Sequence, residues 1–162
     1  MRAQRRATLL DAMADHLLSH GLAKSPLRAL AAAAATSDRM LLYYFADRDD
    51  LLTALLEHIA GRLASLLNSG GFNTSRPYAE LLAELWSLTQ KPTFQPYMLL
   101  FLELAAASGR GEEPHRTAAG RIARGFTSWI SERLIETDGR RQARAALLLA
   151  NLDGLFLLYS AG

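Results

Sequence analysis

The sequence predicts an all-α fold, and three observations support this. Apolar residues recur at helical spacing along most of the 162 residues, and no stretch alternates between apolar and polar residues as a half-buried strand does. Prolines stand at or near the start of several of these segments, where the missing N–H is tolerated. Half of the residues are hydrophobic, so the chain can bury a sizeable core.

The first helix is predicted over residues 3–20. Gly21 follows it and suits the position after a helix C-terminus, because glycine adopts a left-handed backbone at little cost. His16 and His20 are four residues apart and could share a metal ion, but no third ligand converges on them. We therefore expect two solvated histidines and no metal site. The apolar stripe of this helix consists of Leu9, Leu10, Met13, Leu17 and Leu18.

A second helix is predicted to begin at Ser25, with Pro26 in its first turn. An alanine run then leads to a turn at Ala35. Alanine is tolerated there if the turn keeps φ below zero, and it costs about 1 kcal/mol if the turn requires a left-handed residue. The pattern leaves both possibilities open.

A very short third helix follows. Ser37 offers its N-cap, because a serine hydroxyl can accept a hydrogen bond from a free N–H of the first turn. Leu41 and Phe45 are four residues apart and share one face, which leaves the polar and tyrosine side chains on or near the opposite side. Asp47 offers a second N-cap, with Asp50 in the place of the capping-box acid. The residues between the two helices are therefore held at both ends.

The later segments are also predicted to be helical. A helix over residues 47–67 is followed by a loop at 68–75, which is rich in glycine, serine and asparagine. We expect two domains, residues 1–46 and residues 47–162, with the helix at 47–67 linking them. Four more helices are predicted at residues 77–88, 92–108, 114–137 and 140–160, with breaks at 109–111 and 138–139.

Composition excludes several classes of protein. Cysteine is absent, so disulfides and thiolate metal sites are excluded. No apolar run approaches the ~20 residues of a membrane-spanning helix, and the N-terminus has no secretory apolar core. We expect a cytoplasmic protein that does not bind membranes. The net charge is only +2, so any nucleic-acid partner must be favoured by where the cations lie.

One combination of residues in the N-terminal part is informative as a set. It consists of Leu9, Ala12, Leu17 and Gly21, of Ser25-Pro26-Leu27-Arg28-Ala29-Leu30-Ala31, of the turn Ala35-Thr36-Ser37, and of Leu41, Tyr43, Phe45, Arg48 and Leu51-Leu52. In this combination the chain resembles the DNA-binding half of the TetR family of bacterial transcriptional regulators. The family usually has glycine where this chain has Ala35, tyrosine where it has Leu42, and lysine where it has Arg48. In the family that tyrosine and lysine typically touch DNA phosphates, so Leu42 removes one contact and Arg48 preserves a cation.

The resemblance implies an N-terminal three-helix helix-turn-helix domain whose third helix reads a double-stranded DNA operator. Arg39 can pair with guanine, and Met40 can touch a thymine methyl group. The alternative is that these side chains are simply the exposed side of a short helix, and Asp38 repels phosphate. The DNA-binding residues implied are Ser25, Arg28, Ser37, Asp38, Arg39, Met40, Tyr43, Tyr44 and Arg48.

The resemblance also implies a C-terminal helical bundle for ligand binding and dimerisation. Aromatic stripes are usually core, but a bundle that encloses a cavity would line it with them. Glu103 lies in an apolar run and is a candidate polar group, because a carboxylate is seldom buried unpaired. The candidate ligand-binding residues are Trp86, Tyr97, Phe101, Glu103, Phe126 and Trp129, and the candidate dimer residues are Ile122, Trp129, Leu148, Leu152 and Leu155.

The leading hypothesis is a homodimeric transcriptional regulator. A small-molecule effector would release this repressor from an inverted-repeat operator, because two heads on one two-fold axis read inverted half-sites. The alternative is a TetR-like helical ligand-binding or interaction protein with weakened DNA binding, suggested by Leu42, Asp38 and Ala35. We find no nucleophile, base and orienter in the sequence, so we expect no catalytic residues, no cofactor and no enzyme activity.

Overall fold

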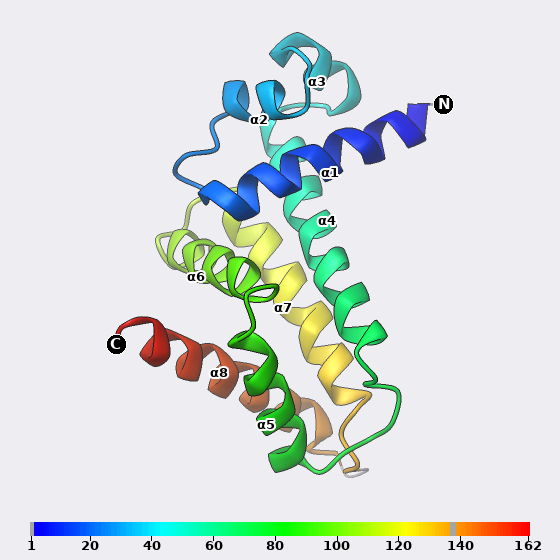
Figure 1. Cartoon of the computed structure of the whole chain (residues 1–162), viewed down its shortest axis with the longest axis vertical. Helices are drawn as coiled ribbons and strands as arrows, with labels where there is room; N and C mark the ends of the chain where they lie inside the picture. Colours follow the sequence, from blue (N-terminus) through cyan, green and yellow to red (C-terminus); the bar gives the residue numbers. More distant parts are fainter. Residues whose placement is uncertain (1, 137–138) are drawn as a thin grey trace. The chain divides into compact units, whose positions relative to one another are not determined.

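The computed structural model describes residues 2–136 and 139–162. Within these residues the chain forms eight helices and no strand, which confirms the predicted all-α fold (Figure 1). The helices are α1 (Arg2–His20), α2 (Leu27–Ala33), α3 (Asp38–Tyr44), α4 (Arg48–Ser69), α5 (Tyr78–Thr89), α6 (Gln95–Gly109), α7 (His115–Ser131) and α8 (Arg141–Ser160).

Two predicted helix starts require correction. The second helix begins at Leu27 and not at Ser25, because Pro26 has extended backbone angles of φ −64° and ψ 162° and serves as the N-cap. The sixth helix begins at Gln95, three residues later than predicted. The residues before it form a turn in which the Phe94 N–H donates to the Lys91 carbonyl at 2.9 Å.

The seventh helix ends at Ser131, well before the predicted residue 137. The chain leaves the helix because it pairs with a distant segment. The Arg76 N–H donates to the Arg133 carbonyl at 2.8 Å, and the Ile135 N–H donates to the Arg76 carbonyl at 3.0 Å. These two bonds require extended backbone beside Leu134. Residues 137 and 138, where we placed the end of this helix and part of the following break, lie outside the described residues.

The chain divides into two compact units. The first contains the residues up to Arg62 together with Leu99–Ala119, and the second contains Leu63–Met98 and Gly120–Gly162. Three helices, α4, α6 and α7, each contribute residues to both units. The predicted boundary between a DNA-binding domain and a ligand-binding domain, at residues 46 and 47, remains a prediction. The two compact units do not follow it, because most of α4 and α6 belongs to the same unit as α1, α2 and α3.

The first unit has a core formed by α1 to α4 together with buried residues of α6 and the start of α7. The predicted stripe of α1 is confirmed, since Leu9, Met13 and Leu17 are fully buried. Leu41 and Phe45 bury one face of α3, as their spacing predicts. The remaining core residues of the chain up to Arg62 are Leu10, Ala14, Leu30, Ala31, Ala34, Leu51, Leu55, Leu56 and Ile59.

Two ion pairs join α1 to α4 on the outside of this core. The His58 Nε2 lies 2.8 Å from the Asp11 carboxylate, and the Arg62 Nη1 lies 2.8 Å from the Asp15 carboxylate. The partners are four residues apart on each helix, so the two pairs stand one turn apart. Because all four side chains are partly exposed, each pair contributes no more than about 1 kcal/mol. Their structural effect is to pair both acidic side chains of α1.

The second unit contains α5 and α8 packed together. Leu81 and Leu85 of α5 are buried, as are Leu148 and Phe156 of α8. At one end, the guanidinium of Arg133 is held by three neutral acceptors. It donates to the carbonyls of Phe72 and Trp129 at 2.9 and 2.8 Å and to the Asn68 Oδ1 at 2.9 Å.

Candidate nucleic-acid interface

The short helix α3 is held by caps on both sides, as predicted. The Ser37 hydroxyl accepts a hydrogen bond from the Met40 N–H at 3.3 Å, which satisfies one free donor of the first turn. The Asp47 carboxylate accepts from the Asp50 N–H at 2.8 Å, and the Asp50 carboxylate accepts from the Ala46 N–H at 2.9 Å. These bonds stop α3 and start α4 within four residues, so the orientation of α3 is locally determined.

The turn between α2 and α3 places Ala35 in the left-handed region, with φ +48°. The Thr36 N–H donates to the Ala31 carbonyl and the Ala35 N–H donates to the Ala32 carbonyl, both at 3.0 Å. This pair of bonds is the Schellman motif, in which glycine usually occupies the left-handed position. The open question about this turn is answered: alanine stands where a left-handed residue is needed, at a cost of about 1 kcal/mol.

The outward face of α3 is formed by side chains that the core leaves free. Arg39 and Tyr43 are four residues apart and lie opposite buried Leu41. Tyr43 is 59% exposed, and Met40 and Leu42 on the flanks are 43% and 46% exposed. A helix with this much exposed apolar and aromatic surface presents an available binding face.

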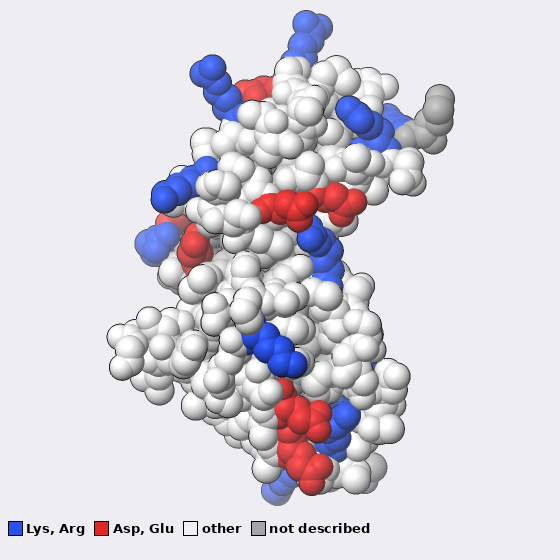
Figure 2. Space-filling model, in the orientation of Figure 1, with Lys and Arg blue, Asp and Glu red and all other residues white. Residues whose placement is uncertain are grey.

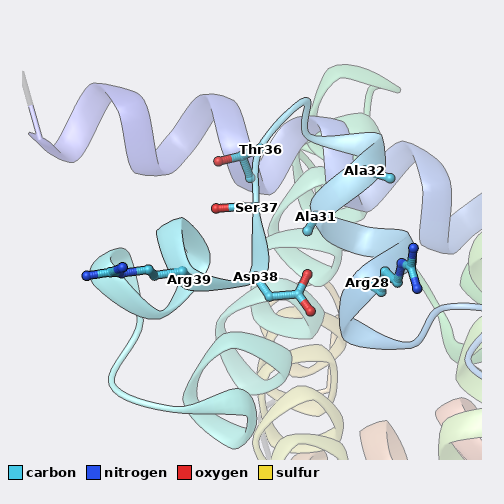
Figure 3. A pocket seen from close by; sticks show the side chains of 7 residues that line it. All are labelled: Arg28, Ala31, Ala32, Thr36, Ser37, Asp38 and Arg39. Atoms are coloured by element: carbon cyan, nitrogen blue, oxygen red, sulfur yellow. The ribbon is translucent and has the colours of Figure 1, made fainter.

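An open hollow of about 570 Å³ lies between α2 and α3. In Figure 3, Asp38 points across it toward α2, where Arg28 is found, and Arg39 points away from it. The lining therefore includes two cations and one anion, and the alanines between Arg28 and Asp38 leave room for close approach. The lining residues are Arg28, Ala31, Ala32, Thr36, Ser37, Asp38 and Arg39.

The predicted DNA-binding residues fall mainly on this surface. Tyr44 is half-buried against the edge of Tyr43, whose ring centre is 5.1 Å away. Ser25 is an exception and a correction: it is only 8% exposed, and its hydroxyl donates to the Gly21 carbonyl at 2.7 Å. It holds the turn between α1 and α2 and is not available to a partner. The exposed members of the predicted set are Arg28, Ser37, Asp38, Arg39, Met40, Tyr43 and Arg48.

Charged side chains of both signs lie on the surface of the first unit. Figure 2 shows Lys and Arg side chains projecting around the end that carries α2 and α3, while acidic side chains gather farther along α1. The acids of α1 are Asp11 and Asp15, the partners of His58 and Arg62. Cations and anions are mixed near α3, because the exposed acids Asp38, Asp47, Asp49 and Asp50 lie in α3 and around the start of α4.

Two arginines of α1 that were not among the predicted site residues contact α3. The Arg2 Nη2 donates to the Tyr43 carbonyl at 2.9 Å, and its guanidinium lies 5.0 Å from the centre of the Tyr43 ring. The Arg6 guanidinium lies 4.6 Å from the centre of the Phe45 ring. The sequence shows that Arg2 and Arg6 are four residues apart and so share one face of α1. It does not show which element that face contacts.

Glu103 requires correction as a buried ligand-binding group. It is exposed, and its Oε2 accepts a hydrogen bond from the Leu22 N–H at 2.7 Å. Gly21 has φ +77° and lies so close to this carboxylate that a side chain there would collide with it. Glu103 therefore fixes the turn after α1.

The other predicted ligand-binding residues divide between the two units. Phe101 lies in the first unit with Glu103, whereas the other four lie in the second. Trp129 is 9% exposed, and its Nε1 donates to the Asn68 Oδ1 at 2.8 Å while the Arg133 guanidinium covers its ring at 3.9 Å. These contacts assign Trp129 to the core. The remaining three are buried Tyr97 and half-buried Trp86 and Phe126.

The predicted dimer residues also need correction. Leu148 is fully buried and Leu152 is 8% exposed, because both pack inside the second unit. Ile122 is half-buried and Leu155 is 39% exposed, so these two remain available. The apolar surface that α8 exposes consists of Leu147, Leu155, Leu157, Leu158 and Tyr159.

By length and composition, α8 could cross a membrane, and it is the one such helix among the described residues. This corrects the expectation that no apolar run is long enough. Core helices of soluble proteins meet the same criterion but are mostly buried, whereas 22% of this stretch of α8 is buried. One helix of this kind is weak evidence for a membrane span.

The two histidines of α1 differ from the expectation of two solvated side chains. Their rings stack at 4.2 Å, and the His16 Nε2 is shielded from solvent, so only His20 is exposed. Within the described part of the chain, no group of three His, Cys, Asp or Glu side chains could hold a metal ion.

Solved structures of regulators share this all-helical architecture. No family model matches the sequence, and no curated protein does. A Rhodococcus sp. protein described as a TetR-family transcriptional regulator is 24% identical, with a TM-score of 0.76 over 94% of this chain and 85% of its own. A transcriptional regulator from Rhodococcus sp. Rha1 is 22% identical, with a TM-score of 0.72 over 94% of this chain and 81% of its own. A TetR transcription regulator from Haloarcula marismortui is 21% identical, with a TM-score of 0.69 over 94% and 84%.

These similarities show the class of fold, which is the all-helical arrangement of these transcription regulators. More specifically, the chain has the TetR fold, as the resemblance of its N-terminal residues predicted.

Proposed function

We propose that the protein is a DNA-binding transcriptional regulator, a homodimeric repressor that a small-molecule effector releases from an inverted-repeat operator. The observation that carries this proposal is the outward face of α3, whose helix is capped before and after and whose opposite side is fully buried. The fold and the names of the similar structures support a regulator over an enzyme.

The dimensions of α3 suit a major groove. Seven residues make a helix about 10 Å long, at about 1.5 Å per residue. Its diameter with side chains is about 10 to 12 Å, which matches the width of the major groove of about 12 Å, so α3 can lie in the groove with Arg39 and Tyr43 facing the bases. Arg39 can donate two hydrogen bonds to guanine, and Met40 can contact a thymine methyl group.

Phosphate contacts would position this helix. Arg28 borders the hollow beside α3, and Arg48 is the first residue of α4, so the two cations stand at two different helix starts. The small side chains of Ala31 and Ala32 let a DNA backbone approach the hollow closely. Asp38 repels phosphate, which weakens binding to all sequences alike and so opposes these contacts.

The second unit supplies the rest of the mechanism. A second copy of the chain would cover the exposed apolar face of α8, through Leu147, Leu155 and Leu158, and pair the two heads on a two-fold axis. An effector bound among the helices after α4 would act on that helix, which is continuous between the two units. Ligand and operator would then oppose each other with equal coupling free energy.

An alternative is an interaction protein of the same fold with weakened DNA binding. It is favoured by Leu42, which is 46% exposed at the family's phosphate-binding tyrosine position. Asp38 favours it too.

The test is selection of duplexes from a random DNA pool by the purified protein, followed by affinity measurements at two salt concentrations. The proposal predicts an enriched inverted repeat whose binding weakens steeply with salt. Arg39→Ala should lose discrimination at one base position of each half-site, costing about 1 to 3 kcal/mol. Arg124→Ala on α7 is the matched control, because it removes the same charge from an exposed site in the second unit.

If no sequence is enriched and Arg39→Ala binds DNA as Arg124→Ala does, the regulator proposal fails. The alternative then takes its place, and binding studies move to the second unit.

A further inference from the structure

The first two turns of α1 hold α3 through a pair of arginines. Arg2 and Arg6 are four residues apart and so share one face of α1. Each places its guanidinium over an aromatic ring near the end of α3, Arg2 over Tyr43 at 5.0 Å and Arg6 over Phe45 at 4.6 Å. We call these four residues the arginine clamp.

Arg2 also satisfies the backbone of α3. The last carbonyls of a helix have no partner within it and form the negative end of its dipole. The Arg2 Nη2 donates to one of these, the Tyr43 carbonyl, at 2.9 Å. A cation at this end of the helix is therefore favourable both as a donor and as a charge.

The length of α3 makes such an anchor important. Helices shorter than about 12 residues are marginal in water, so a seven-residue helix depends on tertiary contacts. Its own buried side chain is Leu41, and Phe45 follows as its C-cap. The arginine clamp adds contacts on the part of α3 farthest from the Ser37 cap.

The clamp reaches the surface that would read DNA. Tyr43 lies on the outward face of α3, near its C-terminal end, and shares that face with Arg39, four residues before it. Because Arg2 contacts both the ring and the carbonyl of Tyr43, it restricts the direction of that ring and the rotation of the helix beneath it.

We propose that Arg2 and Arg6 are positioning residues that set the sequence specificity of α3 by fixing Tyr43 and the helix end. This inference rests on the proposed function, since it assigns a role in reading DNA. The positioning role differs from a simple phosphate contact, which weakens binding to all sequences alike and lowers the salt dependence by about one counterion.

The chain contains a matched control for this test. Arg5 lies in the same part of α1, is exposed, and carries the same charge. The cation–π contacts to Tyr43 and Phe45 are made by Arg2 and Arg6. The experiment compares Arg2→Ala, Arg2→Lys and Arg5→Ala, each bound to the selected duplex and to a scrambled one at two salt concentrations. Because Arg6 covers the core residue Phe45, Arg6→Ala could also destabilise the fold. Its DNA affinities are therefore compared only if its thermal unfolding matches that of the wild type.

Arg2→Ala should lower the ratio of selected to scrambled affinity by about fivefold, from the loss of one hydrogen bond and one cation–π contact. Arg5→Ala should lower both affinities equally and leave the ratio unchanged. Arg2→Lys should recover only part of the ratio, because lysine keeps the charge without the planar guanidinium. Equal effects of Arg2→Ala and Arg5→Ala, or a uniform loss with a reduced salt slope, would overturn the positioning role.

Amide hydrogen exchange of the free protein separates this inference from the proposed function. Arg2→Ala should speed exchange of the Phe45 N–H, which donates to the Leu41 carbonyl at 3.0 Å, and leave the α4 amides unchanged. If the exchange is unaffected while the wild type still selects a duplex, the inference fails and the function stands. If the exchange responds but the wild type enriches no duplex, the function fails and takes the positioning role with it.

Discussion

Replacement of Ala35 by glycine tests the turn that joins α2 to α3. Ala35 has φ +48°, a conformation in which its Cβ crowds the following carbonyl. Relief of that contact is worth about 1 to 2 kcal/mol. Glycine has a more flexible unfolded chain, which costs about 0.4 to 1 kcal/mol. The net expectation for Ala35→Gly is a rise of about 1 kcal/mol in the free energy of unfolding.

The matched control lies three residues earlier. Ala32 is exposed in α2, so Ala32→Gly makes the same chemical change in ordinary helical backbone and should lower the free energy of unfolding by about 1 kcal/mol. Both variants are measured by urea unfolding, with the slope checked because the chain has two compact units. A rise in midpoint for Ala35→Gly and a fall for Ala32→Gly are expected.

A refutation would be equally clear. If both variants lose stability by the same amount, Ala35 does not occupy a left-handed position that glycine prefers. The strain argument for the turn is then wrong, whatever the effect on DNA binding.

Three further predictions concern individual side chains. Glu103→Ala should lower the free energy of unfolding by about 1 kcal/mol, because it leaves the Leu22 N–H without its acceptor. Glu103→Gln should restore most of this stability, and equal losses in both variants would count against the hydrogen bond. Arg133→Ala should cost about 3 kcal/mol, since its guanidinium donates to three neutral acceptors and its side chain is 15% exposed. Arg110→Ala is the control and should change the free energy of unfolding very little, because both partners of the Arg110–Glu112 ion pair are exposed. Desolvation raises the pKa of Asp153 from 3.8 to about 6, so the folded state holds this proton more tightly and stability should fall as the pH rises from about 4 to 6. Asp153→Asn should remove that fall, which amounts to less than about 1 kcal/mol because the Asp153 side chain is exposed and solvent screens it. An unchanged pH profile in this variant would refute the prediction.

Local chemistry was readable from the sequence. The Ser37 cap and the Asp47 and Asp50 pair depend on residues within four positions of one another, and the structure contains their hydrogen bonds. The buried pair Leu41 and Phe45 follows from helical spacing alone. For the same reason the outward face of α3, and with it most of the candidate DNA-binding residues, could be predicted.

Even local reasoning reached a limit at the turn. The sequence could state what a left-handed Ala35 would cost but not whether the turn requires one. That depends on the direction in which α3 leaves α2, which is set by the packing of α2 against α1 and of α3 against α2.

Contacts between distant segments were decided by tertiary structure. Spacing identified Leu148 and Leu152 as one apolar face of α8, but not that this face packs within its own unit and leaves Leu147 and Leu158 exposed. An acid in an apolar run suggested a buried Glu103, yet the structure pairs it with Leu22, 81 residues earlier in the chain. A pattern states which side chains share a face, because that follows from the geometry of one helix. Which element covers that face depends on the arrangement of all the helices, and so only the fold could reveal it.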